Sequence, residues 1–269
     1  MREIEELKLC TWNLGLGAAI TWCSKKELKR EAVDKLMKQA ADIIVLTEYA
    51  VCKGCDYLHE QAMDNGYIWK EYNITGSNGI FILIKRDLVK DAEKEAKKLW
   101  DNKGFALNPN INMLEWTIKL KNGKKLCILG LRMTVELDGN LEDQYNKLGE
   151  DLKDVLIKRV KELKAANDIV IVAGDFNNAR YLDSYEDYAQ ENYNWQIIKN
   201  AFEGIGFNML DLDKNDKHVI TKIDNGPDSP IDHIFARGLE KADSEAVHTE
   251  AVSGFDHKIL AVNAKLSAE

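Results

Sequence analysis

The sequence predicts an α/β protein in which two packed β-sheets carry helices on their outer faces, and three observations support this fold class. A strand, a helix and a second strand follow one another near the N-terminus, which is typical of a crossover unit packed on one face of a sheet. Alternating apolar residues around an Asn-Gly dipeptide predict an antiparallel hairpin in the middle of the chain. A long amphipathic helix then precedes another apolar strand.

The crossover unit is predicted from residue type and spacing. Residues 7–12 and 43–47 are almost entirely apolar, so each is expected to form a buried strand. Apolar residues recur three or four positions apart from Leu28 onward, which predicts a helix that begins near Lys25. A third apolar run over residues 79–85 predicts another strand of the same kind.

The rest of the chain shows both helical and strand patterns. The segment 90–100 fits either a helix or a strand. Residues 116–120 alternate up to Asn122-Gly123, whose tolerance of positive φ favours a tight turn into residues 125–131. Helical spacing over residues 145–163 predicts a long amphipathic helix. The remaining patterns predict a helix near residues 195–202 and strands over residues 169–173, 208–212, 231–236 and 259–264.

Composition narrows the class of protein. The 269 residues include 37 Lys+Arg and 45 Asp+Glu, so 37 − 45 gives a net charge of −8, which excludes a basic nucleic-acid-binding arm but not a local basic groove. With 45% hydrophobic and 30% charged residues the chain is typical of a globular protein, and 3 Pro and 17 Gly leave few linkers, so we expect one domain over residues 1–269. No long apolar run or signal-peptide pattern is present, so we expect no membrane insertion and a cytoplasmic location.

The five cysteines are an odd number, which favours reduced thiols in a reducing compartment over a disulfide framework. Cys52 and Cys55 stand three positions apart, a spacing found in zinc sites and in redox pairs. A zinc site needs a second pair of ligands, and the chain offers none at a suitable spacing. We therefore interpret both as ordinary thiols in the loop that follows Glu48.

Polar and ionisable residues gather at the ends of the predicted strands. Each of them alone fits a helix cap or a turn residue, but strand ends are also where a rigid scaffold presents side chains to one another. As a set they supply many oxygen ligands and little nitrogen or sulfur, which predicts Mg²⁺ or Mn²⁺ and not Zn²⁺. The set consists of Asn13, Glu48, Asp175, Asn177, Asp232, Asp256 and His257.

Five motifs that contain these residues resemble, in order, those of the endonuclease/exonuclease/phosphatase superfamily. The superfamily includes DNase I-like nucleases, abasic-site endonucleases, inositol polyphosphate phosphatases and sphingomyelinases. The resemblance implies a four-layer α/β sandwich of the DNase I-like type, with two facing mixed β-sheets, helices outside, and the active site at one edge of the sheets. The motifs are Thr11-Trp12-Asn13, Leu46-Thr47-Glu48, Gly174-Asp175-Phe176-Asn177, Ser229-Pro230-Ile231-Asp232-His233-Ile234 and Gly254-Phe255-Asp256-His257.

The resemblance also implies roles for single residues in a metal site. It makes Glu48 the main metal ligand, with Asn13 beside it and Asp256 completing the inner or water-mediated shell. The expected cofactor is Mg²⁺, with Mn²⁺ as a substitute. In such a site the metal neutralises charge on the phosphoryl oxygens and lowers the pKa of bound water.

Four further residues are implied as the catalytic group. By the resemblance, Asp175 and Asn177 orient or deprotonate the attacking water and hold the phosphoryl group. His257, hydrogen-bonded to Asp232, is either the general base or a phosphate-binding imidazolium, since a neighbouring carboxylate raises the pKa of an imidazole. The expected reaction is in-line attack of water on phosphorus.

Arg132 is a departure from the pattern. It stands after residues 127–131, where most relatives carry a His. Arginine stays protonated and is no ordinary general acid, but its fork binds phosphate in a bidentate way, so we expect Arg132 to contact substrate. Three alternatives follow for the leaving group: metal-bound water protonates it, Arg132 stabilises the developing charge, or activity is reduced.

These residues lead to three functional hypotheses. The first is a Mg²⁺-dependent phosphodiesterase that cleaves nucleic acid, as an endo- or exonuclease. The second, motivated by the acidic net charge, is a phosphatase or phosphodiesterase for a small molecule such as an inositol phosphate, a nucleotide or a lipid head group. The third, motivated by Arg132, is a non-catalytic binding protein on the same scaffold. The oligomeric state stays open.

Overall fold

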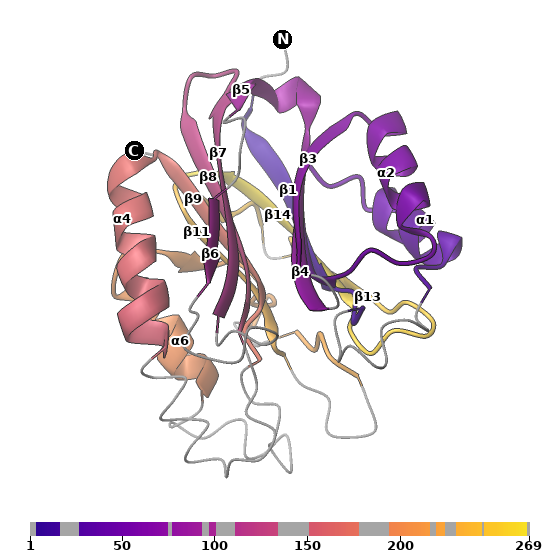
Figure 1. The fold of residues 1–269 in the computed structure, drawn as a ribbon. Coiled ribbons are helices and arrows are strands. Elements are labelled where there is room, and N and C mark those ends of the chain that lie inside the picture. Colours follow the sequence, from indigo (N-terminus) through magenta and orange to yellow (C-terminus); the bar gives the residue numbers. More distant parts are fainter. Residues whose placement is uncertain are drawn as a thin grey trace.

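Two β-sheets face each other in a computed structural model of the chain, and the helices lie on their outer sides (Figure 1). The two facing sheets and their outer helices make the four predicted layers. The structure describes residues 4–16, 27–74, 77–92, 97–100, 111–133, 151–177, 194–215, 219–223, 230–243 and 245–267.

The first sheet has the strand order β12-β14-β1-β2-β4-β3, with β13 paired to β14. β1 and β2 are parallel and are connected through the crossover helix α1, and the other described pairs are antiparallel. α1 (Arg30–Lys38) and α2 (Cys55–Asp64) lie on its outer side. Its strands are β1 (Glu6–Asn13), β2 (Ile43–Tyr49), β3 (Tyr67–Ile74), β4 (Ser77–Lys85), β12 (Leu239–Lys241), β13 (Val247–Glu250) and β14 (Ile259–Leu266).

The second sheet has the order β10-β11-β9-β8-β7-β5, with β6 paired to β7. Here β8 and β9 are the parallel pair, joined through η3 (Asp151–Ile157) and α4 (Lys158–Ala166). α6 (Asn194–Glu203) packs on the same outer side. The strands are β5 (Val89–Ala92), β6 (Lys97–Trp100), β7 (Ile111–Leu120), β8 (Lys125–Met133), β9 (Ile169–Asp175), β10 (Asn208–Met209) and β11 (Asp232–Arg237), and η2 (Arg86–Leu88) precedes β5.

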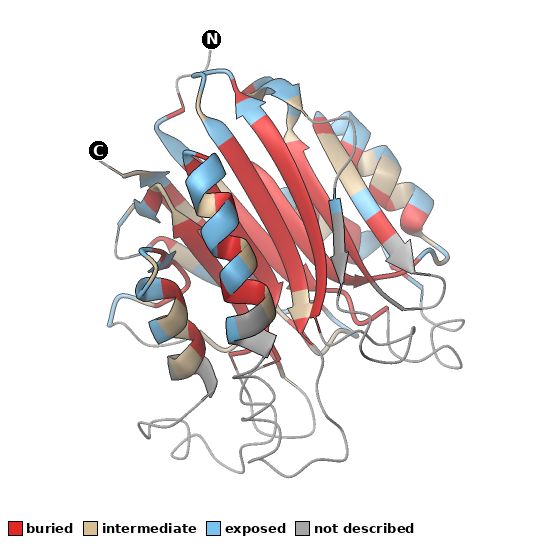
Figure 2. Ribbon diagram, turned by 60° about the vertical axis from the view of Figure 1, so that its left-hand side comes forward, coloured by how far each residue is buried: buried red, intermediate tan, exposed pale blue. Residues whose placement is uncertain are grey.

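Three apolar clusters hold these layers together. The central one lies between the sheets and joins side chains such as Val45 and Ile82 to Trp116 and Ile171 of the opposite sheet. The outer two lie under the helices of each sheet. Figure 2 shows the result: buried residues run along the strands, and exposed residues line the outer faces of the helices. Such burial is the main favourable term in folding.

The structure confirms the main predictions and corrects several boundaries. The Asn122-Gly123 turn joins β7 to β8, and the described parts of the segment 90–100, residues 90–92 and 97–100, lie in the strands β5 and β6. The first helix begins at Arg30, not near Lys25, because Lys29 has the extended backbone angles φ −67° and ψ 143°. Lys25 itself, and residues 145–150 of the predicted long helix, lie outside the described residues.

Five of the described elements were not predicted: α2, η2, β3, β12 and β13. β3 mixes aromatic, charged and apolar residues without a clean period of two, and β12 and β13 are three and four residues long. The strand predicted over residues 208–212 covers only Asn208–Met209. Short strands of this kind are determined by pairing with a neighbour and not by their own residue pattern. No helix in the described ranges is long and apolar enough to span a membrane.

Gly174 allows β9 to approach β8 closely at the end of the parallel pair. Its φ is +143°, and a Cβ at this position would lie 2.0 Å from the carbonyl oxygen of Leu131. Only glycine avoids both the backbone strain and the clash. This close approach places Asp175 beside Arg132 in the parallel register.

We expect Gly174→Ala to lower the free energy of unfolding by about 3 kcal/mol or more, because strand backbone cannot move aside as a flexible side chain can. Gly123→Ala is the matched control: Gly123 also has a positive φ, +90°, but no atom lies within 4 Å of an added Cβ. Gly123→Ala should lower the free energy of unfolding by only about 1 kcal/mol. Urea unfolding measures both, and equal losses would contradict the role assigned to the close approach.

Candidate active site

Strand register brings the predicted residues to one end of both sheets. Asn13 ends β1 and pairs with Thr47, the residue before Glu48 on the parallel strand β2. In the second sheet Asp175 ends β9, where it pairs with Arg132 of β8 on one side and with Asp232 of β11 on the other. Five strands from the two sheets therefore contribute polar side chains to the same place.

Asp232 and His257 form a buried ion pair in this group. His257 Nδ1 lies 2.7 Å from Asp232 Oδ2, and the two side chains are 4% and 0% exposed. The indole N–H of Trp12 donates to the backbone carbonyl of His257, and the Thr221 hydroxyl accepts from the backbone N–H of Asp232. Burial alone would lower the pKa of His257, but the charge of Asp232 and its hydrogen bond raise it to about 9. His257 is therefore an imidazolium at neutral pH.

Asp175 lies next to this pair, and both of its carboxylate oxygens accept hydrogen bonds. Its Oδ2 accepts from Asn13 Nδ2 at 2.7 Å, and its Oδ1 accepts from the backbone N–H of Asn177 at 2.8 Å. Burial and the negative charge of Asp232 raise the pKa of Asp175 to about 6, against the opposing effect of His257. The carboxylate is ionised at neutral pH but takes up a proton more readily than an exposed aspartate.

Glu48 forms the second ion pair of the site, with Arg132. Arg132 Nε donates to Glu48 Oε1 at 2.8 Å, and the side chains are 12% and 11% exposed. Burial alone would raise the pKa of Glu48, but the charges of Arg132 and His257 and hydrogen bonds from Asn13 and Arg132 lower it to about 2. Glu48 is thus a firmly ionised carboxylate.

The backbone at Glu48 is strained. Its φ is +48°, a conformation that residues with a side chain rarely adopt, and the register of β2 against β4 shifts between Leu46 and Tyr49. Strain of this kind costs on the order of 1–3 kcal/mol and is concentrated at functional sites. The bulge turns Glu48 out of the regular alternation of β2.

Asn13 links the two ion pairs. Its amide nitrogen donates to Asp175 and also hydrogen-bonds to Glu48, while its Oδ1 accepts from the backbone N–H of Gly15. Both carboxylates therefore depend on one fully buried carboxamide. Asn177, with a φ of +48°, holds its side chain by donating to the carbonyl of Met133.

Asp256 does not join the buried group. Its side chain is 45% exposed, and its Oδ2 lies 3.4 Å from Lys222 Nζ. Lys222 is nearly buried and pairs with His257 in an isolated β-bridge. Two residues of the site were not predicted: Lys222, which contacts Asp256, and Thr221, which accepts from the backbone of Asp232. No signal in a single sequence marks them, since a Lys or Thr among apolar residues is typical of any strand edge.

Two carboxylates and an imidazole of the site lie close enough together to be considered as metal ligands. Asp175, Asp232 and His257 have ligand atoms within 4.8 Å of one another, and Asp232 Oδ1 is buried without a hydrogen-bond partner in the described part of the chain. His257 Nδ1 already bonds Asp232, and the raised pKa of His257 favours the protonated imidazole, which is not a metal ligand. The ionised Glu48 and neighbouring carboxylate oxygens form a donor set that fits a hard divalent cation.

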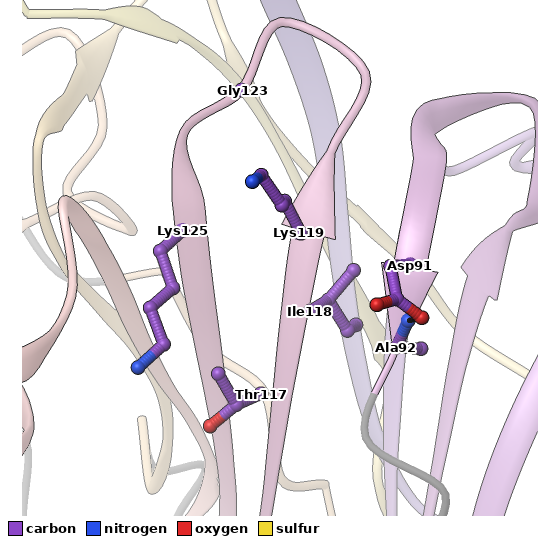
Figure 3. A pocket seen from close by; sticks show the side chains of 7 residues that line it. All are labelled: Asp91, Ala92, Thr117, Ile118, Lys119, Gly123 and Lys125. Carbon is purple, nitrogen blue, oxygen red and sulfur yellow. Dashed lines mark hydrogen bonds between the residues drawn. The ribbon is translucent and has the colours of Figure 1, made fainter.

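A separate cavity of about 330 Å³ lies away from this group. Figure 3 shows its lining side chains on β5, β7 and β8, with Lys119 and Lys125 on adjacent strands. Lys125 begins β8 and Arg132 stands seven residues later, so the two ends of the strand are about 20 Å apart. The cavity is not part of the candidate site.

Comparison with known proteins is consistent with this geometry. The model of the endonuclease/exonuclease/phosphatase family matches residues 10–253. No curated protein matches the chain in sequence. Among solved structures, truncated TDP2 from Caenorhabditis elegans is similar with a TM-score of 0.63 and 14% identity, covering 97% of this chain and 98% of that chain.

Two further solved structures are similar over nearly the whole of this chain. An endonuclease/exonuclease/phosphatase from Beutenbergia cavernae has a TM-score of 0.67 and 15% identity, covering 98% of this chain and 72% of that chain. The 3′ phosphatase NExo from Neisseria, solved with a product DNA hairpin, has a TM-score of 0.59 and 14% identity, covering 97% of this chain and all of that chain, 100%. At these identities the likeness shows a common DNase I-like fold.

The raised pKa of His257 predicts a pH dependence of stability in metal-free protein. A group whose pKa is higher in the folded than in the unfolded protein stabilises the fold through its proton. For His257 this stabilisation is complete below pH 6.5, the pKa of an ordinary histidine, and is lost as the pH rises through about 9. Urea unfolding in the presence of a chelator across this window should show wild type losing stability with pH. His257→Gln should lack this loss, and parallel pH curves for the two proteins would rule out the raised pKa.

Proposed function

The chain belongs to the endonuclease/exonuclease/phosphatase family and is a hydrolase of phosphoester bonds, and from this premise we propose that it is a Mg²⁺- or Mn²⁺-dependent phosphodiesterase that cleaves nucleic acid. The observation that carries the proposal is the buried arrangement of two ion pairs, Asp232–His257 and Glu48–Arg132, on either side of Asp175. Fixed charges in a buried site suit a reaction in which negative charge develops on phosphoryl oxygens.

Glu48 is the proposed metal ligand. Its pKa of about 2 keeps the carboxylate ionised at any working pH, and its backbone strain is typical of a residue held for chemistry. Asn13 fixes its position through a buried hydrogen bond. A bound Mg²⁺ or Mn²⁺ supplies charge neutralisation at the phosphoryl group and lowers the pKa of water. Asp256 is half-exposed and bonded to Lys222, so we assign it no direct contact with the ion.

Asp175 is the proposed acceptor of the proton from the attacking water. Its pKa of about 6 lies close to working pH, where a general base is most effective. Hydrogen bonds from Asn13 and Asn177 orient the carboxylate before substrate arrives. Asn177 contributes through this orientation, because its own amide already donates to the carbonyl of Met133.

His257 acts in this scheme as a cation and not as a base. Its pKa of about 9 keeps the imidazolium at neutral pH, with Nδ1 committed to Asp232. A fixed buried cation favours a phosphoryl group whose negative charge increases toward the transition state. Of the two roles open from the sequence, the structure supports the phosphate-binding imidazolium.

Arg132 has a role that the sequence alone did not suggest. It neutralises Glu48 through a direct hydrogen bond. A divalent cation on Glu48 would compete with the guanidinium for the same carboxylate, and Arg132 would then be able to contact a phosphoryl oxygen. Arginine binds phosphate through its planar fork, which suits the substrate contact expected for this residue.

Nucleic acid is the substrate class that we favour. The similar 3′ phosphatase NExo was solved with a product DNA hairpin, which supports a polymeric substrate for this fold. The net charge of −8 favours the second candidate, a small phosphorylated molecule, because an acidic protein gains little from a long polyanion. A non-catalytic binding protein would have no need of a strained Glu48 beside a buried, charge-balanced cluster.

Glu48→Gln and His257→Ala should each reduce metal-dependent cleavage by at least about 100-fold, because each removes a fixed charge from the reacting centre. The assay is cleavage of supercoiled plasmid and of labelled single-stranded DNA and RNA, with Mg²⁺, with Mn²⁺ and with chelator. His248→Ala is the control, since His248 is exposed on β13.

Cleavage that survives both substitutions would refute the site. If neither DNA nor RNA is cleaved and phosphate is released from small substrates, the protein is a phosphatase for small phosphorylated molecules. If nucleic acid is the substrate, the apparent affinity of the protein for it should fall steeply as the salt concentration rises, because each neutralised phosphate releases counterions.

Arg132→Ala should raise the affinity of the substrate-free protein for Mn²⁺ by about tenfold, since an unpaired buried carboxylate gains more from a cation. Isothermal titration calorimetry measures this affinity directly. Arg159→Ala is the matched control because Arg159 also pairs with a buried carboxylate, Glu115, on the outer side of the second sheet. Unchanged or weaker Mn²⁺ binding by the Arg132 variant would show that the guanidinium does not compete for Glu48.

A further inference from the structure

The loop between β2 and α2 brings two cysteines into contact. Cys52 Sγ lies 3.4 Å from Cys55 Sγ, and the backbone N–H of Cys52 lies 3.4 Å from the same Cys55 sulfur. The two residues flank Lys53 and Gly54 and stand just after Glu48 in the chain. Neither sulfur takes part in the proposed hydrolysis, so the contact needs its own explanation.

The backbone holds the two sulfurs together without a covalent bond. The N–H of Cys55 donates to the carbonyl of Cys52 at 3.2 Å, and Gly54 has φ +95° and ψ −9°, as expected for the third residue of a type II turn. The turn is anchored because Leu28 N–H donates to the Lys53 carbonyl at 2.9 Å. The ends of a β-turn lie within about 7 Å, which includes the Cα separations found in disulfides.

The turn also depends on glycine. A Cβ at Gly54 would lie 2.0 Å from the carbonyl oxygen of Leu28, and its positive φ disfavours any other residue. The local sequence Cys52-Lys53-Gly54-Cys55 thus fixes a geometry in which the sulfurs need move only from 3.4 Å to about 2.05 Å to bond.

The two thiols differ in access. Cys52 is partly exposed, whereas Cys55 is 2% exposed. Cys10 and Cys127, also described, are buried in the core. A reagent in solution therefore reaches Cys52 first. Hydrogen bonding to Cys52 and burial raise the pKa of the Cys55 thiol, so it stays protonated until its partner has reacted.

We propose that Cys52 and Cys55 form a redox-active dithiol that closes to a disulfide in the presence of a small-molecule disulfide such as oxidised glutathione. The Cys52 sulfur attacks the oxidant, forms a mixed disulfide and releases one glutathione thiol. The Cys55 sulfur then attacks the Cys52 sulfur and releases the second glutathione thiol. The protein loses two electrons and two protons, and both are carried by the two molecules of reduced glutathione.

Closure of the disulfide alters the backbone that follows Glu48. The Cys55 thiol donates to the carbonyl of Ala50 at 3.2 Å, and Ala50 is two residues beyond Glu48. A disulfide sulfur carries no hydrogen and must also move toward Cys52, so this hydrogen bond is lost. Control of hydrolysis through Glu48 rests on the proposed function, but the disulfide and the backbone change do not.

Thiol counting across a series of reduced to oxidised glutathione tests the disulfide. The folded protein is incubated with glutathione, quenched with acid, unfolded and alkylated, and its mass is then measured by mass spectrometry. The five cysteines should fall to three alkylated ones (5 − 2) under oxidising conditions and return to five with reductant. Trypsin cuts after Lys53, between the two cysteines, so the linked peptide identifies the pair. Cys23→Ser should keep this behaviour and Cys52→Ser should abolish it.

Five alkylated thiols in oxidised glutathione, or a disulfide that maps to another cysteine, would overturn the proposal. Hydrogen exchange then tests the backbone change without reference to activity. Amides of residues 47–52 should exchange faster in the oxidised wild type than in the reduced wild type, and Cys52→Ser should show no such difference. A mapped Cys52–Cys55 disulfide with unchanged exchange would refute the link to Glu48, whatever the substrate assays show.

Discussion

The buried ion pair between Asp232 and His257 sets the electrostatics on which the rest of the site depends. An isolated charge in this position would be strongly unfavourable, and removing one partner of a buried pair costs about 3–5 kcal/mol. The side chains of His257 and Asp232 are 4% and 0% exposed, and the pair raises the pKa of His257 to about 9. Burial and the negative charge of Asp232 raise the pKa of Asp175, while the charges of Arg132 and His257 lower the pKa of Glu48. The pair thus contributes to opposite pKa shifts at two neighbouring carboxylates.

The fold supplies this arrangement through strand register. Each sheet contains one parallel pair, and both pairs end where the polar residues stand: Asn13 beside Thr47 in one sheet, Arg132 beside Asp175 in the other. Gly174 permits the close approach in the second sheet, and the bulge at Glu48 turns a carboxylate out of the first. The rigid core between the sheets holds the two ends together, so the site needs no large rearrangement to bring its charges into contact.

The sequence predicted the parts of the structure that local patterns determine. Apolar strands, the Asn122-Gly123 turn and the polar residues at the strand ends were all recognisable from spacing, and the motif order indicated the fold. The Glu48–Arg132 pair was not predicted, because it joins two sheets through residues 84 positions apart. Thr221 and Lys222 were missed because a Thr or Lys among apolar residues is typical of any strand edge. The contact between Cys52 and Cys55 depends on Gly54, whose turn conformation is stabilised by Leu28, a residue far from the loop in sequence.

Glu48 and its neighbours are proposed to form one divalent-metal site for phosphoester hydrolysis. Crystals soaked in Mn²⁺ and measured at the manganese absorption edge test it most directly, because the anomalous signal locates the ion without assumptions about activity. We expect an ion bound to the Glu48 carboxylate, with the Arg132 guanidinium displaced from it. An ion bound elsewhere, or an intact Glu48–Arg132 pair at saturating Mn²⁺, would contradict it.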